Sequence, residues 1–158
     1  MRQVQQLIGF LSLSLVCVST AFSASLSYTA NDLLTSKSIA FPKTNANATV
    51  IVFLSAKCPC SGGHEPYLKT LYEKFSGPSS GVEFIGVHSN QDEAKDTSVE
   101  HFKAAALPFP VVQDEGAKIA DQLKALKTPH VFIVKKAKSY FKAESTIRPA
   151  PRLQKSIF

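Results

Sequence analysis

The sequence predicts an α/β domain with a mainly parallel central sheet, and two observations support this prediction. Apolar, β-branched runs at 49–55, 82–87 and 131–134 are typical of strands that are covered on both faces. Segments with helical spacing of apolar residues lie between them, at 62–75 and 89–106. Strands that alternate with helices at this spacing indicate βαβ units, in which the strands are parallel.

The other early elements follow from local signals. Residues 24–46 show little periodicity and are interpreted as a lead-in to the fold, with a short edge strand near 38–41. The first helix is predicted to begin near Ser61 and to end at Gly77-Pro78. The polar cluster at 89–92 is a typical start for the second helix.

A short strand and a third helix precede the last buried strand. The segment 109–112 is apolar and predicts the strand. Ile119, Leu123 and Leu126 recur at helical spacing and predict a helix over 115–126.

Residues 1–23 have the pattern of a secretory signal peptide. Arg2 provides a basic start, an apolar run covers 7–18, and Ala21-Phe22-Ser23 offers small residues for cleavage. The apolar run is short for a membrane span, although an uncleaved anchor is the alternative. We therefore expect a periplasmic or secreted protein with no stable membrane insertion after cleavage.

The net charge of +6 does not predict nucleic-acid binding, because the basic residues are concentrated at one end. Residues 24–134 contain 10 lysines, no arginine and 11 acidic residues. Residues 135–158 contain 7 basic residues and only Glu144 as an acid. A charged terminus of this kind is usually solvated.

The sequence Cys58-Pro59-Cys60-Ser61 lies between the first buried strand and the first helix. The end of such a strand is where α/β proteins place their chemistry. Cysteines this close cannot brace a fold, because the loop that they close is very short. A helix N-terminus stabilises a thiolate, and Lys57 adds a positive charge. The pattern predicts a thiol redox site, with Cys58 as a small buried apolar residue as the alternative.

The chain resembles the thioredoxin superfamily, and within it the redoxin or AhpC/TSA group with its exported TlpA-like relatives. The resemblance covers residues 47–135, the expected domain, and implies a three-layer thioredoxin-like fold. The motifs that carry it, in order, are Val50–Leu54, Cys58-Pro59-Cys60-Ser61, Pro66, Leu107–Asp114 and Thr128-Pro129.

The resemblance implies that Cys58 is the nucleophile, while Ser61 takes the position of the family's second cysteine. Exchange completed by a second cysteine at that position therefore cannot occur. Two alternatives remain for Cys60: it resolves the attack through a small, strained disulfide with Cys58, or it packs in the helix and a partner's thiol resolves Cys58.

Thr128-Pro129 matches the family's cis-proline, which implies substrate binding at these two residues. The alternative is a trans-proline that begins a strand. Peroxiredoxins of this superfamily have a proline and a threonine that shape the peroxide pocket, and the resemblance places Ile51 and Ser55 at these two positions. Thiol–disulfide exchange is thus expected rather than a dedicated peroxidase.

After the cis-proline strand, the family adds an antiparallel strand and a final helix. Ser139-Tyr140-Phe141 matches the start of the strand, but the rest of the tail lacks a helical pattern. We therefore interpret 136–158 as a basic, poorly ordered tail that is truncated, frame-shifted or divergent. A missing helix would leave apolar surface exposed near 131–134 and would favour a homodimer.

The combined prediction is an exported thiol–disulfide oxidoreductase, or antioxidant redoxin, that needs no cofactor. Its expected partners are protein thiols or disulfides, or a reducing protein. One alternative is a Cu(I) or Zn(II) carrier that binds metal through Cys58, Cys60, His64 and His130. Another is a degenerate binding domain without redox activity.

Overall fold

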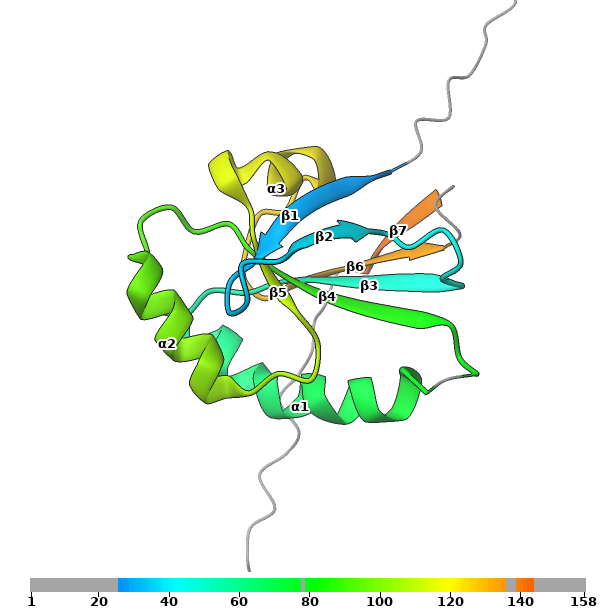
Figure 1. The fold of residues 1–158 in the computed structure, drawn as a ribbon, viewed down its shortest axis with the longest axis horizontal. Helices are drawn as coiled ribbons and strands as arrows, with labels where there is room; N and C mark the ends of the chain where they lie inside the picture. Colours follow the sequence, from blue (N-terminus) through cyan, green and yellow to red (C-terminus); the bar gives the residue numbers. More distant parts are fainter. Residues whose placement is uncertain (1–25, 78, 136–138, 144–158) are drawn as a thin grey trace, which may run out of the picture.

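Figure 1 shows the computed structural model of the chain, which describes residues 26–77, 79–135 and 139–143. These residues form a single sheet with strand order β2-β1-β5-β4-β3-β6-β7. The elements in chain order are β1 (Tyr28–Asp32), β2 (Ser38–Phe41), β3 (Ala48–Phe53), α1 (Pro59–Phe75), β4 (Val82–His88), α2 (Lys95–Ala105), β5 (Val111–Gln113), the 3₁₀ turn η1 (Glu115–Ala117), α3 (Lys118–Leu123), β6 (His130–Lys135) and β7 (Ser139–Ala143).

The sheet is mixed, whereas the sequence predicted a mainly parallel one. Only β3, β4 and β5 are parallel, because α1 and α2 each return the chain across the sheet before the next strand. The other pairings are antiparallel. Helix α3 has six residues, or about 9 Å, which is too short to return the chain. Strand β6 therefore starts at the end of the sheet where the parallel strands β3, β4 and β5 finish, and its first residue, His130, pairs with Phe53 at the end of β3.

The three-layer α/β architecture expected from the sequence is confirmed. Helices α1 and α2 cover one face of the sheet, and α3 lies on the other (Figure 1). Alternation along β3 supplies both cores: Ile51 and Phe53 face the α3 side, and Val52 faces α1 and α2. A contact of 2.6 Å between His101 Nε2 of α2 and Glu65 Oε1 of α1 joins the two helices.

The predicted lead-in at 24–46 is part of the fold, since it contains β1 as well as the expected edge strand β2. Strand β1 pairs with β2 on one side and with β5 on the other. Its sequence Tyr-Thr-Ala-Asn-Asp is too polar to stand out as a strand. Asp32 is buried because its carboxylate accepts the backbone N–H groups of Leu34 and Thr35 at 3.0 and 2.6 Å.

Two helices are shorter than their sequence pattern predicted. The polar cluster at 89–92 belongs to a loop, and α2 begins only at Lys95. Gly116 and Ala117 adopt positive φ angles of 72° and 54°, so α3 cannot begin before Lys118. The third helix ends at Leu123, which leaves Leu126 81% exposed on the loop that follows.

Strand β7 lies within the predicted tail, begins at Ser139 as the resemblance implied, and pairs antiparallel with β6. The predicted signal peptide at 1–23 and the tail after residue 143 lie outside the described residues. Within the part of the chain that the structure describes, no helix is long and apolar enough to cross a membrane.

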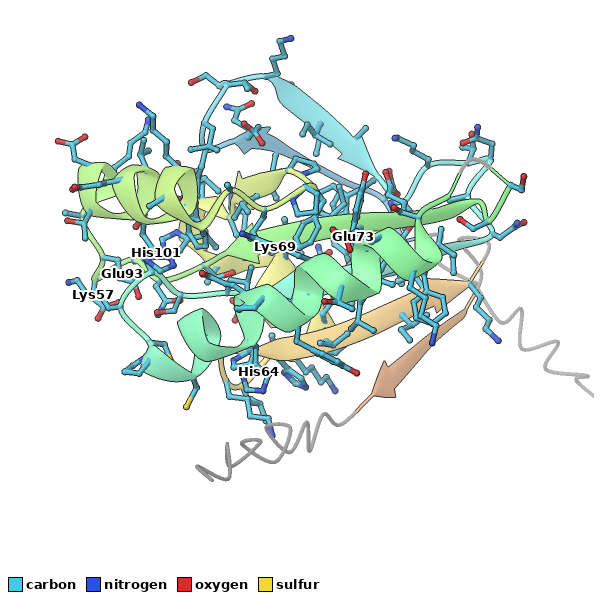
Figure 2. The ribbon with its side chains drawn as sticks, turned by 90° about the horizontal axis from the view of Figure 1, so that it is seen from below. Lys57, His64, Lys69, Glu73, Glu93 and His101 are labelled. Carbon is cyan, nitrogen blue, oxygen red and sulfur yellow. The ribbon has the colours of Figure 1, made fainter. Side chains whose placement is uncertain are left out.

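An apolar cavity of about 370 Å³ opens beside α1, on the face that Figure 2 shows. Val131 and Ile133 of β6 contribute half-buried side chains to it, while Phe132 and Val134 are fully buried on the opposite face. Its other lining residues are also apolar: Ala48, Val50, Leu71, Phe75, Val82 and Phe84. In Figure 2, α1 lies over the middle of the sheet, with β6 and β7 beyond it.

We expect this cavity to bind a hydrophobic dye, because contiguous apolar surface of this kind is uncommon on a soluble monomer. Ile133→Ser should reduce dye fluorescence, whereas Leu126→Ser, which changes an exposed leucine outside the cavity, should not. Sedimentation measurements would test the predicted homodimer at the same time. A monomer that binds no dye would contradict the exposed apolar surface.

Candidate active site

Cys58 is the N-cap residue of α1, and Pro59 occupies the first turn of the helix. Its backbone is extended, with φ −79° and ψ 114°, and the first helical bond runs from Gly62 N–H to Cys58 O at 3.2 Å. Cys58 is half-buried, Cys60 is exposed, and both are free thiols. The nucleophile predicted from the sequence thus lies at a helix N-terminus.

Hydrogen-bond donors around the sulfur hold the pKa of Cys58 below its ordinary value. The backbone N–H of Ser61 has the largest effect, and burial acts in the opposite direction. The Thr128 side chain, the backbone N–H of Cys60 and the Ser61 side chain lower the pKa further. Because a thiolate accepts hydrogen bonds from these donors better than a thiol does, the arrangement favours the nucleophilic form.

Ser61 is part of the turn that leads into α1. Its side chain is fully buried, and its hydroxyl oxygen accepts the backbone N–H of Ser55 at 3.1 Å. The Ser55 hydroxyl oxygen in turn accepts the backbone N–H of Cys58 at 3.1 Å. These two hydroxyls tie the end of β3 to the start of the helix.

The peptide bond between Thr128 and Pro129 is cis, as the resemblance implied. Pro129 directly precedes β6, and the pairing of His130 with Phe53 brings this loop to the cysteine turn. The sulfur of Cys58 lies 3.5 Å from the carbonyl oxygen of Thr128. The structure therefore brings three of the predicted site residues together.

A second cavity, of about 550 Å³, has Thr128 as part of its lining. Loop residues 89–92, residues of α3 and the exposed Leu126 form its walls. Because Thr128 is shared between the cavity and the cysteine turn, a peptide bound at Cys58 would have this space beside it.

A buried polar network beneath the turn was not predicted from the sequence. The Glu93 carboxylate accepts the Ser55 hydroxyl and the backbone N–H of Ala56, the latter at 2.8 Å. His88 Nε2 lies 3.0 Å from the same carboxylate, and the two side chains are only 1% and 2% exposed. Burial acts to raise the pKa of Glu93, but hydrogen bonds from Ser55, His88 and Ala56 outweigh it and lower this pKa.

Two other predicted residues, Lys57 and His64, make separate contacts. The exposed Lys57 donates through Nζ to the carbonyl oxygen of Asp92 at 3.2 Å. His64 Nδ1 contacts the carbonyl oxygen of Cys60 at 2.6 Å. Figure 2 shows Lys57 and Glu93 near one another, at the end of the molecule where α1 begins.

The alternative metal site is not assembled. His130 is 1% exposed, and its Nδ1 accepts the backbone N–H of Leu126 at 3.3 Å. Its ring packs on Phe132 with the ring centroids 4.4 Å apart. Among the described residues, no group of three or more His, Cys, Asp or Glu side chains could hold a metal ion. The set Cys58, Cys60, His64 and His130 is therefore not supported as a ligand set.

Several solved structures share this fold. An uncharacterised conserved protein from Geobacillus kaustophilus is 19% identical, with a TM-score of 0.69 over 80% of this chain and 70% of that one. The thioredoxin domain of a thiol-disulfide oxidoreductase from Bacteroides vulgatus is 17% identical, with a TM-score of 0.65 over 77% and 85%. A secreted disulfide oxidoreductase of Mycobacterium tuberculosis is 14% identical, with a TM-score of 0.63 over 76% and 84%.

These similarities establish a thioredoxin-like fold. A comparison with curated protein sequences finds no significant match. The model of the AhpC/TSA family, by contrast, matches residues 23–139. Since this match spans well over half of the sequence, the chain belongs to the AhpC/TSA family.

Proposed function

We propose that the protein is an exported thiol–disulfide oxidoreductase, an antioxidant redoxin in which Cys58 is the nucleophile. The observation that carries the proposal is the position of Cys58 at the N-terminus of α1, where the N–H groups of Ser61 and Cys60 lower its pKa. A thiolate at pH 7 is the species that attacks disulfides. The expected partners are therefore proteins that carry an accessible disulfide or thiol.

The first chemical step is an exchange of sulfur bonds. The Cys58 thiolate attacks one sulfur of a partner disulfide, so that a bond forms between Cys58 and that sulfur while the original S–S bond breaks. The other partner sulfur leaves as a thiolate and takes a proton from water. The product is a mixed disulfide. The two-electron reduction of the partner disulfide is complete only when a second thiol cleaves this mixed disulfide.

Cys60 is proposed to resolve the mixed disulfide, with an external thiol as the alternative. Attack by the Cys60 thiolate on Cys58 would form a Cys58–Cys60 disulfide and release the second partner thiol. Cys60 is exposed and two residues from Cys58, which supports its access to the reaction. Ser61 is excluded from this role because it has no sulfur and is buried in the turn.

Two features of the residues before Cys58 favour exchange with protein thiols over peroxide chemistry. The Ser55 hydroxyl is engaged by Glu93 and by the backbone N–H of Cys58. Ile51 is buried in the core, where the peroxidase pattern would have a proline. Thr128 and Pro129, beside the sulfur, are proposed to bind the backbone of an extended substrate.

Export to the periplasm or outside the cell is proposed from the N-terminal pattern of residues 1–23. The Mycobacterium tuberculosis protein of similar fold is described as secreted, which is consistent with this location. An oxidising compartment would allow a disulfide of this protein to persist.

The pKa of Cys58 gives a direct test of the nucleophile. Alkylation by iodoacetamide, followed on the Cys58 peptide by mass spectrometry across a pH series, should have its midpoint below the free-thiol value of about 8.5. Since the shift is downward, Cys58 should react at pH values where an ordinary thiol is still protonated. The Cys60→Ser variant should keep this midpoint. A midpoint at or above the free value would remove Cys58 from the nucleophilic role.

Exchange activity tests the reaction itself. Reduced protein should cleave a disulfide-bonded model protein, and Cys58→Ser should abolish this activity. Cys60→Ser should keep the first step and accumulate mixed disulfides, which non-reducing electrophoresis detects. Mixed disulfides in equal amounts with and without Cys60 would assign resolution to an external thiol. An inactive wild-type protein would support the degenerate binding domain.

A further inference from the structure

We propose that Ser55 and Glu93 are positioning residues that clamp the Cys58 turn in its reactive geometry. The inference rests on the proposed role of Cys58 as nucleophile. It adds Glu93, and it gives Ser55, at the position of the peroxiredoxin threonine, a role in holding the turn through Glu93. It concerns how the turn is held and gives neither residue contact with a substrate.

The clamp reaches the turn at three successive points. One oxygen of the Glu93 carboxylate accepts the Ser55 hydroxyl, and the other accepts the backbone N–H of Ala56 at 2.8 Å. The Ser55 hydroxyl oxygen then accepts the backbone N–H of Cys58 at 3.1 Å. Two buried side chains, Glu93 and Ser55, thereby fix the path of the backbone up to the nucleophile.

The base of the clamp is anchored in the centre of the sheet. His88, the last residue of β4, places Nε2 3.0 Å from the Glu93 carboxylate and Nδ1 3.1 Å from the Gln113 side-chain oxygen on β5. The Ser98 hydroxyl of α2 lies 3.2 Å from the same Nε2, so side chains from several elements hold the imidazole in place. Buried partners of this kind are costly to separate, because each would leave the other unpaired.

The direction in which Glu93 changes the Cys58 pKa distinguishes a clamp from a direct effect of its charge. A carboxylate near Cys58 repels a thiolate, so its negative charge alone would raise the pKa of the thiol. A carboxylate that holds the turn has the opposite net effect, since it keeps the N–H groups of Ser61 and Cys60 directed at the sulfur. Removing the charge while retaining the shape separates these two possibilities.

The first arm of the test uses Ser55 in the full chain, with iodoacetamide labelling of the Cys58 peptide measured across a pH series. Ser55→Ala should slow alkylation at pH 7 by roughly three- to tenfold, because one pKa unit changes the thiolate fraction about tenfold. Ser55→Thr keeps the hydroxyl and should restore the rate. Thr49→Val is the matched control: it removes another buried hydroxyl–glutamate bond on β3, 2.8 Å long, at the opposite end of the strand.

The second arm uses Glu93→Gln, which keeps the shape and removes the charge. The clamp predicts slower alkylation and a higher Cys58 pKa, because the amide cannot accept both the Ser55 hydroxyl and the Ala56 N–H. Faster alkylation would mean that Glu93 acts only as a charge and would overturn the proposal. Wild-type rates in Ser55→Ala, or an equal loss in Thr49→Val, would also overturn it.

The two proposals fail in different ways. If wild-type protein lacks exchange activity but Ser55→Ala still raises the Cys58 pKa, the oxidoreductase function fails and the clamp stands. If wild-type protein is active and Ser55→Ala alkylates at the wild-type rate, the clamp fails and the function stands.

Discussion

The antiparallel pairing of β6 with β3 is the constraint on which the site depends. Because Phe53 at the end of β3 faces His130 at the start of β6, the segments that follow one strand and precede the other meet at the same edge of the sheet. Cys58 and Thr128 are 70 residues apart in the chain, yet the sulfur and the carbonyl oxygen are separated by 3.5 Å. A parallel β6 would have placed the proline loop at the opposite edge.

The electrostatics of the site come mainly from the backbone. The donors that stabilise the Cys58 thiolate include N–H groups at the first turn of α1, while the neighbouring Lys57 is engaged with the carbonyl oxygen of Asp92. Backbone donors do not titrate and cannot rotate away from the sulfur. The stabilisation of a thiolate at Cys58 therefore depends on the path of a short turn, and buried hydrogen bonds from Ser55 and Glu93 connect to that turn.

The parts predicted from the sequence are those with local patterns. The apolar strands and the cysteine turn have characteristic signals within a few residues. The Thr128-Pro129 cis bond was expected only from the family resemblance. Strand β1 was missed because its polar sequence has no strand pattern, and its extended conformation depends on pairing with β2 and β5. The direction of β6 was missed because it depends on how short α3 is, and Gly116 and Ala117 set that length through their backbone angles.

The Glu93 network was missed for a related reason. Glu93 directly follows the polar cluster at 89–92, which has the composition of a helix start, and no local pattern marks its side chain as buried. The carboxylate is instead buried against residues 38 positions earlier in the chain, and the α2 helix starts beyond it. A buried charge of this kind becomes recognisable only when the strands that surround it are in place.

The buried hydroxyl of Ser61 bears on how this site relates to those with two cysteines in the turn. The two kinds of site differ at that position by one atom, oxygen or sulfur. The oxygen here accepts the backbone N–H of Ser55, a bond that sulfur makes only weakly. Exchanging the atom would supply an internal resolving thiol and at the same time loosen the end of β3. Redox capacity and rigidity of the turn are thus opposed at a single position, and this chain has the more rigid of the two arrangements.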